Sequence, residues 1–258
     1  MVKAILFDLA DTLLQFEHLD HRALFMIGAK GTYRYLHDLN IPLPAFEVYT
    51  HAHFRAFRRK YIWSHIRRRD FNVNNVICRV LSKLDIPVAH ADIPELVWRW
   101  YRPLVRRARV ENGTRGMLRE LRRRGLKLAI VSNTCAPDYC LDRHLEREKL
   151  LEFFPTRIYS SNTFYRKPHP LIFQAALDEL AIPAAQAIFV GDLLGADIKG
   201  ARRAGMTTVW KPAERTRTRR RRRVLPDYEI NKLTELANIV NACGVDAKPA
   251  SQAESMRP

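Results

Sequence analysis

Four segments of the sequence end in side chains that could bind a phosphate group and a divalent cation. Each carries a carboxylate, a hydroxyl or a lysine at or near the end of an expected strand or the start of a helix: Asp8, Ser132, Lys167, Asp192 and Asp197. Carboxylate oxygens are the ligands that Mg²⁺ prefers, whereas a lysine and a hydroxyl hold anionic phosphate oxygens. These residue types together predict a site for Mg²⁺ and a phosphoryl group.

The elements expected around these residues alternate between strands and helices. From residue 109 onward, helical segments such as "MLRELRRRG" alternate with apolar strands such as "LKLAIVSNT" and "AIFVGD". This alternation is typical of a parallel sheet with helices on both faces. The carboxyl ends of such strands meet at one edge of the sheet, where the candidate residues should converge. We predict a doubly wound, Rossmann-like α/β core formed by residues 1–15 and 109–242.

Residues 16–108 lack this alternation and are expected to form an inserted all-α cap domain. Their apolar residues recur at helical spacing, as in "DIPELVWRWYRPLV", where positions 93, 96, 97, 100 and 104 form one stripe. The insertion interrupts the core directly after its first strand. Residues 243–258 are expected to be a disordered tail.

Four short motifs occur in a defined order: "FDLADTL", "IVSN", "RKPHP" and "VGDLLGADIKGARRAGM". Their order resembles that of the haloacid dehalogenase-like (HAD) hydrolase superfamily, whose motifs run D-x-D-x-T, S/T, K and G-D-x(3–4)-D, and the helical insertion is similar to its type 1 cap. The resemblance implies that Asp8 is a nucleophile that forms an aspartyl-phosphate. It implies phosphate contacts from Ser132, Asn133 and Lys167. It also implies that Mg²⁺ is held by Asp8, the backbone carbonyl of Ala10, Asp192 and Asp197.

Ala10 departs from this pattern, because most phosphatases of the superfamily have an aspartate two residues after the nucleophile. On an extended segment that spacing points both carboxylates the same way, so the second can protonate the leaving oxygen and later activate water. Alanine keeps the backbone carbonyl but cannot transfer a proton. We expect a turn or capping role for the neighbouring Asp11. His51 and His53 cannot share a ligand, because a spacing of two places them about 200° apart on a helix.

We therefore predict a Mg²⁺-dependent HAD-type hydrolase, a phosphatase acting on a small anionic phosphorylated substrate. One alternative, favoured by Ala10, is a degenerate HAD domain that binds nucleic acid or an acidic partner with little turnover. Phosphonate cleavage is another, and it needs a cap lysine, for which Lys30, Lys60 and Lys83 are available. A dehalogenase would be expected to have an aromatic residue in place of Ala10. The substrate itself is not predicted.

The composition is that of an ordinary globular protein apart from its charge. Of the 258 residues 47% are hydrophobic and 28% charged, and the formal net charge is +17. Seven arginines fall within residues 215–223, a run that could bind nucleic acid or another polyanion. Without a stretch of 18 apolar residues we expect no membrane span and a cytoplasmic location, with the four cysteines reduced. No feature of the sequence bears on the oligomeric state.

Overall fold

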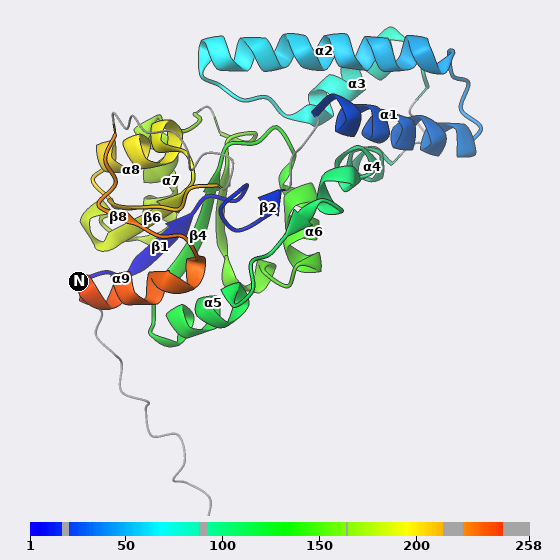
Figure 1. Ribbon diagram of the computed structural model, residues 1–258. Coiled ribbons are helices and arrows are strands. Elements are labelled where there is room, and N and C mark those ends of the chain that lie inside the picture. The colour runs from blue at the N-terminus through cyan, green and yellow to red at the C-terminus, as the bar shows by residue number, and fades with distance from the viewer. Residues whose placement is uncertain (17–20, 88–91, 164, 214–223, 245–258) are drawn as a thin grey trace, which may run out of the picture.

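The core of the protein is a six-stranded parallel sheet. The computed structural model describes residues 1–16, 21–87, 92–163, 165–213 and 224–244. Within them the strand order is β5-β4-β1-β6-β7-β8, and every neighbouring pair is parallel. The strands are β1 (Ala4–Phe7), β4 (Lys127–Ser132), β5 (Thr156–Tyr159), β6 (Ala187–Gly191), β7 (Thr207–Trp210) and β8 (Tyr228–Glu229). Figure 1 shows this sheet with helices on both sides, as the doubly wound prediction requires.

The central strand β1 is buried on both faces, which explains its continuous apolar sequence. Alternate residues point to opposite sides of the sheet, so Ile5 and Phe7 belong to one hydrophobic cluster and Ala4 and Leu6 to the other. The first cluster includes side chains of α5 (Thr114–Arg123), α6 (Asp138–Arg147) and α9 (Leu236–Ala242). The second includes side chains of α7 (Pro170–Leu180) and α8 (Lys199–Arg203). The two faces of the sheet are therefore covered by different helices.

The register of the sheet brings three strand ends to the same edge. Phe7 pairs with Ile130 of β4 on one side and with Val190 of β6 on the other. Asp8 therefore leaves the sheet next to the final residues of both neighbouring strands. The backbone N–H of Asp8 also donates to the carbonyl of Val190, which fixes the start of the loop after β1.

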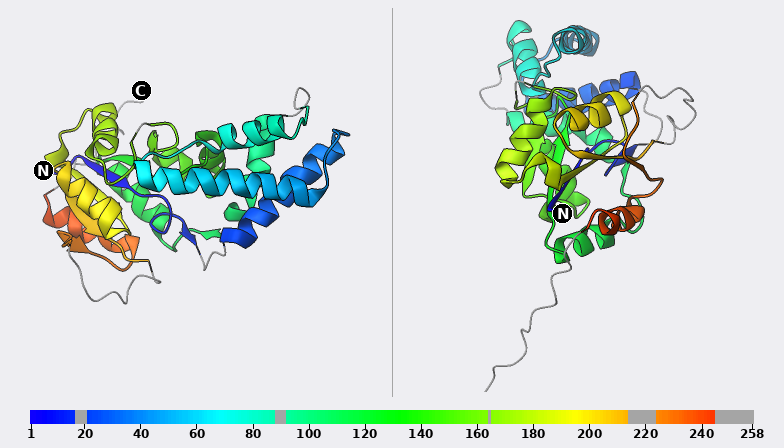
Figure 2. Two further views of the ribbon diagram at one scale, coloured as in Figure 1. Left: turned by 90° about the horizontal axis from the view of Figure 1, so that it is seen from above. Right: turned by 90° about the vertical axis from the view of Figure 1, so that its left-hand side faces the viewer.

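Four helices follow the first strand and form the insertion that the sequence predicts. They are α1 (His21–Asp38), α2 (Phe46–Arg67), α3 (Val73–Lys83) and α4 (Ile93–Val105). Figures 1 and 2 show them beside the sheet, with the long helix α2 on the outside of the group. Gly28 allows α1 to approach α4 closely, because a Cβ atom there would lie 2.7 Å from the carbonyl oxygen of Trp100.

A short antiparallel ribbon joins the insertion to the core. It consists of β2 (Gln15–Phe16) and β3 (Ala108–Arg109), which pair directly with one another. The chain therefore leaves the core and returns to it at the same place. Residues 15–16 and 108–109 are thus adjacent, and the domain boundaries that the sequence places there stay a prediction.

Further contacts hold the insertion against the core. The N–H of Val73, at the start of α3, donates to the carbonyl of Cys135. The hydroxyl of Tyr139 donates to Asn74, and Glu95 of α4 forms an ion pair with Arg143 of α6. These contacts involve α3 and α4 rather than α2.

The structure also contains elements that the sequence did not predict. Helix α6 and strand β5 lie between the second and third motifs, a region to which we assigned no element. Two further predictions, the arginine run 215–223 and most of the tail 243–258, lie outside the described residues. No helix in the described part of the chain is both long enough and apolar enough to cross a bilayer.

Candidate active site

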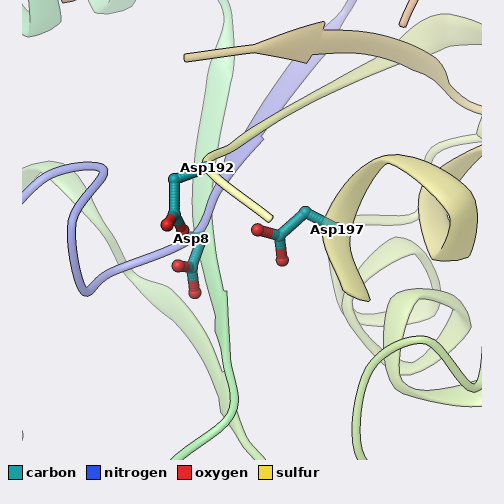
Figure 3. Close-up of side chains that lie close together, drawn as sticks. All are labelled: Asp8, Asp192 and Asp197. Atoms are coloured by element: carbon teal, nitrogen blue, oxygen red, sulfur yellow. The ribbon is translucent and has the colours of Figure 1, made fainter. Parts of the chain in front are cut away.

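Three buried carboxylates meet at the carboxyl edge of the sheet (Figure 3). Asp8 follows β1, Asp192 follows β6, and Asp197 lies on the turn that comes next. One carboxylate oxygen from each lies within 4.8 Å of the others. The side chains come from segments that are almost 190 residues apart in sequence, and the parallel register brings them together.

A turn of π-helix and a glycine together place Asp197 in this cluster. The π-helical turn spans Leu194–Ile198, and the backbone N–H of Leu193 donates to Oδ2 of Asp197 at 2.8 Å. A Cβ atom on Gly191 would lie 2.5 Å from Cβ of Asp197, so only glycine leaves room for this side chain. In the "GD" pair of the fourth motif the glycine is therefore needed for steric reasons and the aspartate for its carboxylate.

Lys167 lies between two of the carboxylates. Its Nζ atom is 2.6 Å from Oδ1 of Asp8 and 2.7 Å from Oδ1 of Asp197, and all three side chains are almost fully buried. Burial opposes the charged form of the lysine, but Asp197 and Asp8 outweigh it, so the pKa of Lys167 is raised above its usual value. The lysine is therefore a permanent cation within the site.

The side chain of Asn133 holds this lysine in place. Its Oδ1 accepts from the backbone N–H of Lys167 at 2.8 Å, and its Nδ2 donates to the backbone carbonyl of the same residue at 3.0 Å. The phosphate contact expected for Asn133 stays a prediction, and the contacts that the structure gives its amide are those with the main chain of Lys167. The geometry supports a positioning role for this side chain.

One lysine does not neutralise three carboxylates. Burial and the nearby charges of Asp8 and Asp197 raise the pKa of Asp192 to about 9. Burial likewise raises the pKa of Asp197 to about 6, although Lys167 opposes this shift. A buried, oxygen-only donor set with excess negative charge fits a hard divalent cation, which would favour the ionised carboxylates.

Ser132 and Ala10 lie at the same edge of the sheet. Ser132 is the last residue of β4 and is buried, and its carbonyl accepts from the N–H of Ser160. Ala10 is an exposed residue of the tight loop after β1. Asp11 adopts a left-handed backbone conformation, with φ of 59°, and its Oδ1 accepts from the N–H of Phe16. This agrees with the turn role predicted for Asp11.

The histidines and lysines of the insertion that the sequence analysis considered as candidates do not lie together in the structure. His53 is buried and contacts the carbonyl of Tyr49 on its own helix, whereas His51 is exposed. Lys30 belongs to α1 and lines a cavity together with Phe46 of α2, and Lys83 ends α3. Of the three cap lysines, Lys60 lines a cavity that also includes residues of the core.

A match to a known protein family covers all the residues of this site. Residues 2–205 match the model of the haloacid dehalogenase-like hydrolases. The chain belongs to this family. This HAD-like hydrolase therefore has the family's parallel sheet and, at the edge of that sheet, the acidic cluster described above.

Individual relatives resemble the chain over almost its whole length. A glyceraldehyde 3-phosphate phosphatase of Pyrococcus abyssi is 28% identical over 254 residues, which cover 97% of this chain and 100% of the relative. A HAD phosphatase of Thermococcus onnurineus has a solved structure with 26% identity and a TM-score of 0.60, covering 95% of this chain and 100% of that one. The HAD-hydrolase YfnB of Bacillus subtilis, solved bound to magnesium, has 25% identity and a TM-score of 0.55 and covers 93% and 99%.

Proposed function

We propose that this HAD-like hydrolase is a Mg²⁺-dependent phosphatase acting on small anionic phosphate compounds. The observation that carries the proposal is the buried arrangement of Lys167 with Asp8, Asp192 and Asp197 at one sheet edge. The phosphatase names of the relatives and the magnesium bound to YfnB support the same conclusion. A purely structural ion-pair network would not need three carboxylates around one lysine, because the excess charge is costly to bury.

In this proposal Asp8 is the nucleophile. One of its carboxylate oxygens attacks the phosphorus, and the bond to the leaving oxygen breaks as the aspartyl-phosphate forms. Water then attacks the phosphorus, the bond to Asp8 breaks, and inorganic phosphate leaves with the Asp8 carboxylate restored. Lys167 and the hydroxyl of Ser132 bind phosphoryl oxygens during both steps.

Asp8, Asp192, Asp197 and the backbone carbonyl of Ala10 would hold the Mg²⁺ ion. When bound, the ion supplies positive charge that lets a phosphate dianion approach the carboxylate of Asp8. Lys167 then orients the phosphate, because it binds a phosphoryl oxygen and is itself held in place by its contacts with Asp8 and Asp197. Asn133 fixes the main chain of that lysine.

Most phosphatases with this motif have an aspartate at the position of Ala10 that transfers a proton to the leaving group. This site lacks that aspartate. A positioned general acid contributes about 10²–10⁴-fold to such a step. The methyl group of Ala10 cannot supply that proton. We therefore infer a preference for leaving groups that are stable as anions, such as aryl phosphates and acyl phosphates.

The deciding experiment is hydrolysis of p-nitrophenyl phosphate by the purified protein with Mg²⁺, beside an Asp8→Asn variant. Nitrophenolate leaves without protonation, so Ala10 does not mask activity on this substrate. Turnover that requires both Mg²⁺ and Asp8 is the expected result. Turnover no higher than that of Asp8→Asn would exclude the phosphatase and favour the degenerate, binding-only domain that Ala10 also permits.

A further inference from the structure

A large recess lies where the insertion meets the core. Two overlapping cavities of about 470 and 510 Å³ form it, and they share Lys60, Asp70, Phe71 and Arg79. Its walls come from the C-terminal half of α2, the loop after it, helix α3 and the core loop 161–163. In Figure 1 and in the left view of Figure 2 the C-terminal end of α2 is the end directed towards the core. Cavities of this size are typical of small-molecule sites.

The charge of this recess is strongly positive. Its basic side chains are Arg59, Lys60, Arg67, Arg69 and Arg79. None of these five forms an ion pair with a carboxylate in the described part of the chain. Five like charges around one concave surface repel one another and attract an anion.

The one carboxylate of the recess is already neutralised. Asp70 forms an ion pair of 3.2 Å with Arg166 and accepts a hydrogen bond from the hydroxyl of Ser160. Its side chain is only 8% exposed, so it offers little negative charge to a ligand. Among the residues that the structure describes, no carboxylate of the recess is therefore left to pair with these five cations.

The partners of Asp70 connect the recess to the candidate active site. Arg166 directly precedes Lys167, and the N–H of Ser160 donates to the carbonyl of Ser132. The core wall of the recess, residues 161–163, therefore lies in the sequence between Ser160, which pairs with Ser132, and Lys167. Asp70 of the recess contacts the residue that directly precedes Lys167.

We propose that this recess binds a second anionic group of the substrate, so that the preferred substrates are small molecules carrying two phosphates or a phosphate and a carboxylate. The inference rests on the proposed phosphatase function, which accounts for the first phosphate. Lys60 and Arg79 line both cavities and are the principal ligands of the second anion. Charge-assisted hydrogen bonds from such groups are stronger than neutral ones.

Binding can be tested without turnover in an Asp8→Asn background. Isothermal titration calorimetry with Mg²⁺ would compare fructose 1,6-bisphosphate with fructose 6-phosphate, which lacks one phosphate. We expect the bisphosphate to bind at least about tenfold more tightly, which corresponds to about 1.4 kcal/mol. Adding Arg79→Gln should remove most of this difference.

The matched control is Arg34→Gln, which lowers the net charge equally. Arg34 is an exposed arginine on α1, next to Lys30 and His37 and outside the recess. It should leave the tenfold preference intact. Equal binding of the two sugar phosphates, or equal effects of the two arginine variants, would overturn the proposal.

A single-stranded RNA that displaces the bisphosphate with higher affinity would also overturn it and assign the recess to nucleic acid. The proposed function is judged separately, by Asp8-dependent turnover of p-nitrophenyl phosphate in the wild-type protein. Failure of one test is therefore distinguishable from failure of the other.

Discussion

The ammonium group of Lys167 lies 2.6 Å from Oδ1 of Asp8, and neither side chain is more than 8% exposed. The ion pair joins the end of the first strand to a loop almost 160 residues later in the sequence. Because both charges are buried, removal of one partner leaves the other without compensation. The pair is therefore important for the stability of the fold as well as for the proposed chemistry.

Replacing Lys167 with Met should lower the free energy of unfolding by about 3–5 kcal/mol, because three carboxylates would then lie together without a cation. Adding Asp8→Asn to this variant should recover part of the loss, since it removes one of the uncompensated charges. Urea unfolding of the two single variants and the double variant measures this coupling. Strictly additive losses would show that the two charges do not interact.

Gly191→Ala should displace Asp197, because the new Cβ atom would lie 2.5 Å from Cβ of that residue. We expect a loss of stability of about 1–3 kcal/mol from overpacking and a fall in Mg²⁺-dependent turnover. Gly195→Ala is the matched control, since a Cβ atom there meets nothing within 4 Å. Similar effects of the two substitutions on turnover would argue against the steric role of Gly191.

Ala10→Asp should raise kcat on alkyl phosphates by at least about tenfold, because it supplies the missing proton donor. The gain on p-nitrophenyl phosphate should be much smaller, since that leaving group needs no proton. The exposed position of Ala10 allows the change without repacking. Ala10→Asn has nearly the same size and no acidic proton, so an equal gain with asparagine would point to a cause other than acid catalysis.

Mg²⁺ should raise the melting temperature of the wild-type protein, and more so at pH 8 than at pH 6. The pKa of Asp192 is raised to about 9, so a proton competes with the cation below that pH. Affinity for the metal therefore increases with pH, as it does wherever a ligand must lose a proton. Differential scanning fluorimetry with EDTA and with Mg²⁺ tests this, and Asp192→Asn should abolish the shift at both values of pH.

The two buried histidines should contribute a loss of stability on acidification between about pH 6.5 and pH 4, opposite in sign to the contribution of Asp192 and Asp197, whose pKa values are raised. Burial lowers the pKa of both His53 and His144 to about 4. In this window the two histidines bind protons in the unfolded chain but not in the folded protein, so their contribution to stability rises with pH. Each histidine contributes about 1–2 kcal/mol to the difference between pH 7 and pH 5.

Urea midpoints of the wild-type protein and of His144→Gln at these two values of pH isolate this contribution. On going from pH 7 to pH 5 the variant should lose about 1–2 kcal/mol less stability than the wild type, even if it is less stable overall. His51→Gln is the control, because His51 is exposed. An unchanged slope in His144→Gln would contradict the assignment.

The sequence predicted the parts of the fold whose pattern is locally strong. The apolar runs of β1, β4 and β6, and the polar residues at or directly after their ends, indicated both the sheet and its functional edge. The order of the motifs added the expected family, which the family comparison confirms. A strand buried on both faces has a continuous apolar sequence, and polar residues mark its end. Both signals can be recognised in the sequence.

Other features depend on contacts between distant segments and could not be predicted in this way. Strand β5 has only four residues, two of them half-buried, so its alternation is too short to recognise. The pairing of Asn133 with the main chain of Lys167 requires the two loops to be adjacent, which no local pattern indicates. The basic recess likewise combines residues from α2, α3 and a core loop.

The ribbon formed by β2 and β3 has a consequence for how such a protein can diversify. Because the insertion leaves and re-enters the core through two paired segments, its ends are held side by side. An insertion of another length or shape could be joined at the same two points without changing the order of the core strands. Evolution could thus exchange the part that selects the ligand while inheriting the acidic edge of the sheet intact.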